Sequence, residues 1–242
     1  MRQVCWLHTM NTPAIRPSRP WMFTALAAII LAIVGVGYGP RIFLIGFYNK
    51  LEMDHWIIRI HVALVSLWLC TFTLQVLLAA TGRLQWHRRV GAWGFRIAFV
   101  WVISALLALA VMLHFDPTTG AESFLLITRI GLFSVCLVMA YRQRRNSAEH
   151  KRWIILGMSQ AIIGGIMRLP APAIVHDFSR AALIALLFPL ALAVYDWATN
   201  RRLARATLWG GILILVVHLV RTPISNSAGW LAIANWIGRL GI

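Results

Sequence analysis

Seven long apolar segments dominate the chain, at about residues 22–39, 56–81, 94–113, 123–141, 153–170, 181–197 and 206–221. A helix needs about 20 residues to cross about 30 Å of hydrocarbon. Of all residues, 60% are hydrophobic and only 12% are charged. In lipid an open sheet would leave backbone groups unpaired, and these runs are too long and too apolar for barrel strands. The sequence therefore predicts an all-α membrane protein, a bundle of about seven transmembrane helices.

The two ends of the chain differ from this apolar body. Residues 1–20 are polar and contain prolines, without an apolar run of signal-peptide type, so we expect a cytoplasmic tail before a transmembrane domain at 21–222. In residues 223–242, apolar side chains recur at helical spacing from Trp230 to Leu240. Tryptophans in so short a stretch are typical of a helix that lies in the membrane interface. We therefore expect an amphipathic helix on the outer surface at the C-terminus.

The basic residues predict an orientation in a bacterial inner membrane. With a cytoplasmic N-terminus, fourteen of them lie on the inner side, at Arg2, Arg16, Arg19, Arg83, Arg88, Arg89, Arg142, Arg144, Arg145, Lys151, Arg152, Arg201, Arg202 and Arg205. Six lie on the outer side, at Arg41, Lys50, Arg168, Arg180, Arg221 and Arg239. Cytoplasmic loops carry an excess of positive charge, so we predict an inner N-terminus and an outer C-terminus. The basic residues behind the formal charge of +16 lie in short clusters between apolar segments, as in the loops of inner-membrane proteins. We therefore expect no nucleic-acid partner.

The segment at 56–81 carries a polar stripe. Asp54, His61, Trp68 and Gln75 recur every seven residues, close to two helical turns, so all four share one face. A polar stripe through a span faces other helices, because polar groups are costly in hydrocarbon. His61 is then either a neutral imidazole bonded to a neighbouring helix, or a metal or haem ligand.

His218 is the partner to test for His61, because both lie at a similar depth near the outer ends of their segments. Arg221 lies one turn beyond His218, and Arg59 and Arg129 belong to the same outer half. Haem iron takes axial ligands from facing helices, and nearby arginines neutralise its propionates. Two interpretations are open. The group is a buried ion-pair network, or the two histidines ligate a metal or haem b while the arginines hold an anionic cofactor or a quinone headgroup.

Two further histidines, His87 and His150, lie where a segment meets the cytoplasm, and each precedes two cations. These cations are Arg88, Arg89, Lys151 and Arg152. Basic clusters at this position bind anionic lipid headgroups, which is the interpretation that the position favours. The alternative is a second haem with His87 and His150 as its ligands, because the two histidines share one depth.

Other features of the segments indicate packing rather than chemistry. Gly157, Ala161 and Gly165 lie four apart, which would let another helix approach closely, and Pro189 should kink its segment. The chain has no P-loop, HExxH or GxSxG motif, and its cysteines form no CxxC pair. The sequence therefore leaves enzyme activity open.

Three stretches resemble a large family of uncharacterised bacterial multi-span membrane proteins. They are HVALVSLWLCTFTLQVLLAATGRLQWHRRVGAWG (61–94), with the family's His…Trp…Gln…Arg…His-Arg-Arg-x-Gly pattern, EHKRWIILG (149–157), with its His-Lys-Arg opening, and YDWATNRRLARATLWGG (195–211). The resemblance covers most of the chain from about residue 22, and it implies a polytopic membrane protein without a settled activity. Where the family commonly reads Arg-x-His-Pro, this chain reads RLAR at 202–205, so it lacks a third inner histidine.

Two functional hypotheses follow, from different classes. The first is a redox membrane protein or subunit that binds haem b or a quinone through its intramembrane histidines. The second is a non-enzymatic membrane protein, either a subunit of a larger complex or a carrier of a small ligand, in which the histidines are structural. An absorbance spectrum separates them, because a haem protein has a Soret band.

Overall fold

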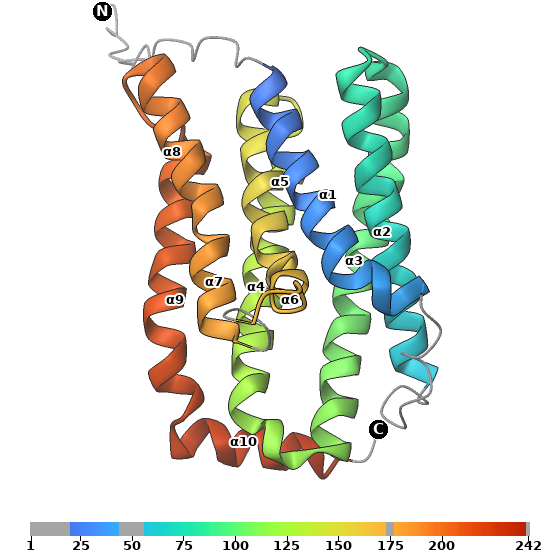
Figure 1. The fold of residues 1–242 in the computed structure, drawn as a ribbon, viewed down its shortest axis with the longest axis vertical. Coiled ribbons are helices and arrows are strands. Elements are labelled where there is room, and N and C mark those ends of the chain that lie inside the picture. Colours follow the sequence, from blue (N-terminus) through green and yellow to red (C-terminus); the bar gives the residue numbers. More distant parts are fainter. Residues whose placement is uncertain (1–19, 44–55, 173–176, 241–242) are drawn as a thin grey trace, which may run out of the picture.

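The computed structural model describes residues 20–43, 56–172 and 177–240, and all of the secondary structure there is helical (Figure 1). The elements are α1 (Pro20–Phe43), α2 (Trp56–Ala80), α3 (Leu84–Phe115), η3 (Pro117–Thr119), α4 (Gly120–Arg142), α5 (Ser147–Ala161), α6 (Ile163–Ile166), α7 (Phe178–Ala185), α8 (Leu187–Asn200), η4 (Ala206–Gly210), α9 (Gly211–Ser225) and α10 (Ala228–Gly238). They form an up-and-down bundle with α10 lying across one end (Figure 1).

Six helical stretches of the described residues are long and apolar enough to cross a membrane. They are Trp21–Gly39, Trp56–Ala80, Leu84–Phe115, Pro117–Arg142, Phe178–Asn200 and Ala206–Ser225. Each corresponds to one of the predicted apolar segments, which confirms the helical membrane fold. The chain is therefore a multi-pass membrane protein.

The remaining predicted segment, 153–170, forms a different kind of helix. The helix begins earlier, at Ser147, and breaks at Ile162 between α5 and α6. It packs against α1, α4, α8 and η4, and residues 155–160 are all buried. Because protein rather than lipid surrounds α5, this pass tolerates the polar residues that keep it from qualifying as a membrane span.

Proline shapes two of the passes. The helix after Phe178 breaks at Leu186, between α7 and α8, because Pro189 has no N–H to bond to the Ala185 carbonyl. This confirms the predicted kink. In α9, Pro223 lies inside the last helical turn, and the helix continues to Ser225, beyond the predicted end of that segment.

Glycines bring the central helices into close contact with two different neighbours. A Cβ on Gly157 would lie 3.1 Å from Cβ of Cys136 in α4. A Cβ on Gly37 of α1 would collide with the carbonyl oxygen of Gly165 in α6, so only glycine permits this backbone contact. Of the small residues predicted to mediate packing, Gly157 and Gly165 do so, with α4 and α1 as their partners.

The C-terminal helix α10 crosses the ends of α3 and α4, as expected for a surface-lying helix (Figure 1). Trp230 Nε1 donates a hydrogen bond to the Gly120 carbonyl at 2.8 Å, and His114 Nδ1 donates one to the Gly238 carbonyl at 2.8 Å. We call this the α10 end of the bundle. At the opposite end, the loop end, α2 joins α3, α4 joins α5 and α8 joins η4 (Figure 1).

The orientation of these ends remains a prediction, and reporter fusions test it. The three connections at the loop end are the cationic ones, at residues 81–83, 143–146 and 201–205. We therefore expect fusions after residues 86, 146 and 203 to report cytoplasm and a fusion after residue 118 to report the outer side. A cytoplasmic signal at 118 together with an outer signal at 146 would reverse the assignment.

Candidate functional site

Three arginines lie near one another inside the bundle, in the half nearer to α10, with Arg221 buried and Arg129 and Arg168 half-buried. Arg129 comes from the middle of α4, Arg168 follows α6, and Arg221 comes from the last turns of α9. Arg129 is the central member, because it is close enough to repel both of the others electrostatically. We call Arg129, Arg168 and Arg221 the arginine cluster.

Gly164 of α6 provides the space in which two of these side chains converge. A Cβ at Gly164 would lie 3.3 Å from Nη1 of Arg129 and 3.4 Å from Nη1 of Arg168. It would also collide with the phenol oxygen of Tyr38 from α1. Arg168 lies over the Tyr38 ring, 5.0 Å from its centroid, and donates to the Gly164 carbonyl at 2.8 Å. Three elements therefore direct polar groups at one point.

Helix α9 supplies the third arginine together with a histidine. The Arg221 guanidinium lies 4.6 Å from the centroid of the Phe178 ring, and the residue is only 4% exposed. His218 lies one turn earlier and its Nδ1 donates to the Ile214 carbonyl at 2.8 Å, so Nε2 carries the lone pair. Both residues therefore lie on the same face of the helix.

Several buried polar atoms of this region lack a hydrogen-bond partner. They are Nε of Arg168, Nη1 of Arg221 and Nε2 of His218. A buried donor or acceptor left unpaired costs about 1–3 kcal/mol, so native proteins have few of them. Among the described residues three further such atoms lie elsewhere, on Trp68, Trp101 and Gln160, and the three beside the arginines would be satisfied by a bound ligand.

No described carboxylate balances the charge of the arginine cluster. In residues 20–43, 56–172 and 177–240, the ion pairs are Arg152 with Asp196 and Arg180 with Asp177, and neither involves the cluster. An uncompensated charge inside a membrane protein is expensive, and such residues mark ligand or ion sites. The cluster is therefore suited chemically to bind an anion.

His61 and His218, the predicted ligand pair, each form a hydrogen bond through Nδ1 with another group. His61 Nδ1 donates to the Ser104 hydroxyl of α3 at 3.1 Å, and that hydroxyl donates to the Trp101 carbonyl at 2.7 Å. His61 belongs to α2, which packs mainly on α3, and His218 belongs to α9, which packs mainly on α4. The haem that these histidines would share has no support from this geometry, whereas a neutral imidazole bonded to a neighbouring helix fits His61.

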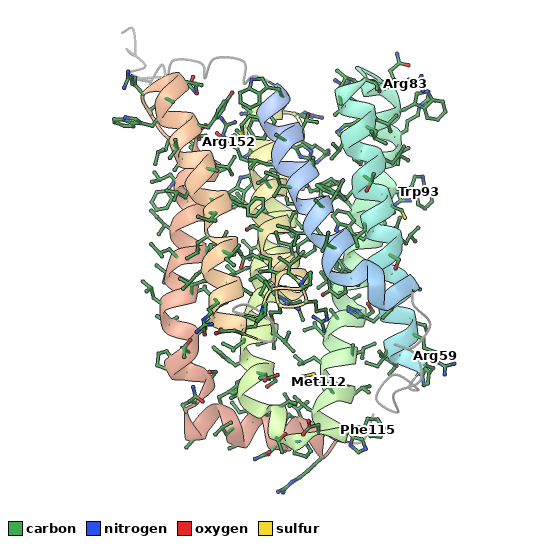
Figure 2. The ribbon with its side chains drawn as sticks, in the orientation of Figure 1. Arg59, Arg83, Trp93, Met112, Phe115 and Arg152 are labelled. Atoms are coloured by element: carbon green, nitrogen blue, oxygen red, sulfur yellow. The ribbon has the colours of Figure 1, made fainter. Side chains whose placement is uncertain are left out.

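Arg59 also lies away from the site in which it was expected. Figure 2 shows its side chain on the outside of α2, and the residue is exposed. Residues on a helix rotate by about 100° each, so Arg59 lies on the opposite face from His61, two positions later. Arg129 and Arg221, by contrast, belong to the arginine cluster, where neither forms an ion pair with a described acid.

The polar stripe of α2 faces α3, as predicted, over its described part. Trp68 is buried and stacks on Trp101 with ring centroids 6.2 Å apart. With its amide oriented to satisfy both polar atoms, Gln75 accepts from the Gly91 N–H at 3.1 Å. Asp54 lies outside the described residues. The stripe thus joins two helices, and its member His61 lies close enough to Arg129 to interact with it electrostatically.

His87 and His150 do come together, with ring centroids 6.5 Å apart. Each ring is held by a backbone carbonyl, since His87 Nδ1 donates to Gln75 at 3.1 Å and His150 Nδ1 donates to Ala140 at 2.9 Å. These bonds tie α3 to α2 and α5 to α4. Among the described residues, no three histidines, cysteines or acids gather as a metal site. A ligand role for this pair remains a hypothesis.

Three of the four predicted lipid-binding cations reach the surface at the loop end, and Arg152 is the exception. Arg88 and Arg89 are exposed, and Lys151 is half-buried over the Phe23 ring. Arg152 is fully buried inside the bundle (Figure 2) and forms an ion pair with Asp196. It therefore does not lie where lipid headgroups lie, which corrects the prediction for this residue.

A buried polar network surrounds that ion pair. Asp196 accepts hydrogen bonds from Nε of Arg152 at 3.1 Å, from the Ala204 N–H at 3.0 Å and from the Thr207 hydroxyl at 2.6 Å. Glu149 accepts one from the Ala206 N–H at 2.7 Å. The network closes the loop end by joining α5, α8 and η4. The sequence signal for it was that Asp196 is an acid at the end of an apolar segment.

The comparisons with known proteins add nothing to this geometry. No family model matches the chain, no curated protein matches it, and no solved structure matches its fold. The resemblance in the His-Arg-Arg and His-Lys-Arg stretches therefore remains a prediction. Any statement about function has to start from the arginine cluster.

Proposed function

We propose that this multi-pass membrane protein binds a small anionic ligand inside its bundle and acts as a carrier for it. The observation that carries the proposal is the arginine cluster. It places three guanidinium groups in the interior, unpaired by any carboxylate of the described residues and accompanied by unpaired buried polar atoms. An anion would balance the charge of the guanidinium groups and would also accept hydrogen bonds from their unpaired N–H groups, because arginine donates charge-assisted hydrogen bonds to oxyanions.

The helices beside the cluster support this proposal. Two neighbouring passes are interrupted, at Ile162 between α5 and α6 and at Leu186 between α7 and α8. Discontinuous helices beside a polar interior site are a recurrent feature of membrane carriers, because a broken helix can tilt in two halves. Gly164, which admits Arg129 and Arg168, lies just after the first break.

The redox hypothesis has no comparable support. His61 forms a hydrogen bond with Ser104, and His218 forms one with the Ile214 carbonyl of its own helix. A quinone headgroup would still find donors at the arginine cluster, but its carbonyl oxygens are uncharged. A neutral ligand would leave the three cations uncompensated, so an anion fits the cluster better.

We expect anions to stabilise the purified full chain. In detergent, sodium phosphate, succinate and acetate are titrated at constant ionic strength while the unfolding temperature is followed. A ligand that binds only the folded state stabilises it by about 2.7 kcal/mol at a concentration of 100 times Kd. At least one of the three should therefore raise the unfolding temperature with a saturable dependence on its concentration.

Matched arginine variants make this measurement specific. Arg129→Gln should remove the anion-dependent shift, and Arg205→Gln, which removes one exposed charge beside η4, should keep it. A shift of equal size in both variants would show that the anions act on surface charge, and the proposal would be wrong. Uptake of the stabilising anion into liposomes containing the protein then tests carrier function, with Arg129→Gln as the inactive reference.

A further inference from the structure

We infer that the anionic group recognised by the arginine cluster is a phosphoryl group rather than a carboxylate. This inference rests on the proposed function and specifies its ligand class. It draws on three features of the site, which are its net charge, the directions from which its donors come, and the lone pair on His218.

The charge of the cluster exceeds what one carboxylate can balance. Arg129, Arg168 and Arg221 carry three positive charges, and the described residues contribute no acid that is paired with them. A carboxylate would compensate one of these charges. A phosphate carries about −1.5 to −2 at pH 7 because its second pKa is about 6, so it compensates most of the excess within one compact group.

The donors approach from more directions than a planar ligand can use. Arg168 and Tyr38 converge with Arg129 at Gly164, on the α1 and α6 side of α4. Arg221 comes from α9, which packs on α4 separately from α6. A carboxylate has two oxygens in one plane, and a single arginine occupies both when it binds in a bidentate manner. A phosphoryl group offers three terminal oxygens in a tetrahedral arrangement, one for each guanidinium.

His218 adds an acceptor that favours the same chemistry. Its Nδ1 proton is committed to the Ile214 carbonyl, so Nε2 presents a lone pair that no described donor meets. An ionised carboxylate has only acceptors and cannot satisfy this atom. The P–OH group of monohydrogen phosphate is a donor and can satisfy it. A ligand that accepts from three arginines and donates to one imidazole therefore fits the unpaired atoms best.

The phosphoryl group has two possible sources, which share this chemistry. It is either a soluble phosphate or the headgroup of a phosphate-bearing lipid that reaches the interior from the bilayer. The test therefore uses inorganic phosphate on protein in detergent, and separately compares protein in nanodiscs of phosphatidylcholine alone with nanodiscs that also contain phosphatidic acid.

The decisive measurement is the ranking of probes on the wild-type chain. We expect inorganic phosphate, or phosphatidic acid in nanodiscs, to stabilise the protein with a Kd at least tenfold lower than that of succinate or acetate. Arg221→Gln should weaken phosphate binding at least tenfold and reduce that preference, whereas Arg205→Gln should leave both unchanged. Phosphate loses its second proton between pH 6 and 8.5 but keeps one P–OH group, so its binding to the wild type should strengthen over this range.

The possible outcomes separate this inference from the proposed function. Succinate or acetate binding as tightly as phosphate, with loss in Arg129→Gln, would overturn the phosphoryl assignment and leave the anion site in place. No Arg129-dependent shift with any probe, in detergent or in nanodiscs, would overturn both. A shift with phosphatidic acid but not with inorganic phosphate would support the phosphoryl assignment and identify a lipid as its source.

Discussion

Arg152→Gln should lower the free energy of unfolding by about 3–5 kcal/mol, the usual cost of removing one partner of a buried ion pair. The substitution leaves the Asp196 carboxylate inside the bundle with the Ala204 N–H and the Thr207 hydroxyl as its remaining donors. Both ion-pair partners are essentially inaccessible to solvent, so water cannot take the place of the guanidinium. Unfolding of the purified protein, followed by circular dichroism, measures the effect.

Two further variants make that result interpretable. Arg205→Gln removes an exposed charge from the connection between α8 and η4, and should change stability by no more than about 0.5 kcal/mol. The double variant Arg152→Gln with Asp196→Asn replaces the ions by two amides and should be more stable than Arg152→Gln alone. If Arg152→Gln is as stable as Arg205→Gln, the network does not hold the loop end together.

Arg221→Leu should raise the free energy of unfolding of the anion-free protein, and it should abolish anion binding. In anion-free buffer, the leucine relieves an unpaired buried donor and the repulsion from Arg129, while it still packs on Phe178. We expect a gain of about 1–3 kcal/mol from removal of the unpaired group. The anion-dependent rise in unfolding temperature should disappear in the same variant.

This combination distinguishes a ligand site from a structural one. A residue kept for ligand binding commonly reduces the stability of the empty protein, so its removal stabilises the fold and abolishes function. Thermal unfolding of wild type and variant, each with and without phosphate, measures both quantities. A variant that unfolds at a lower temperature than wild type in anion-free buffer would show that Arg221 stabilises the bundle itself, contrary to the prediction.

The fold was largely predictable because each membrane pass is a local property of the sequence. A run of apolar residues about 20 long has few alternatives in lipid, and the kink at Pro189 follows from one missing N–H. The surroundings of the segment at 153–170 were harder to predict. Whether a helix of intermediate polarity is surrounded by lipid or by other helices depends on packing between distant segments, and no local pattern contains that information.

The candidate site was predictable only in part, for the same reason. Arg129 and Arg221 stood out because charges inside apolar segments need a reason. Arg168 counted only as a loop cation, because its convergence with Arg129 depends on Gly164 and on the contact of α6 with α1. The depth predicted for His61 and His218 did not show which neighbour each ring faces, and their Nδ1 atoms bond to the Ser104 hydroxyl and the Ile214 carbonyl.

The central position of α5 has a consequence for how the protein is made. Glu149 and Arg152 belong to its first turns, and charged residues within an inserting helix are costly unless they are paired. Helix α5 is therefore a poor candidate for release into lipid as it leaves the ribosome. Its partners for those charges, Asp196 and the Ala206 N–H, are synthesised only later. The insertion machinery should hold α4 and α5 as a pair until α8 and η4 arrive.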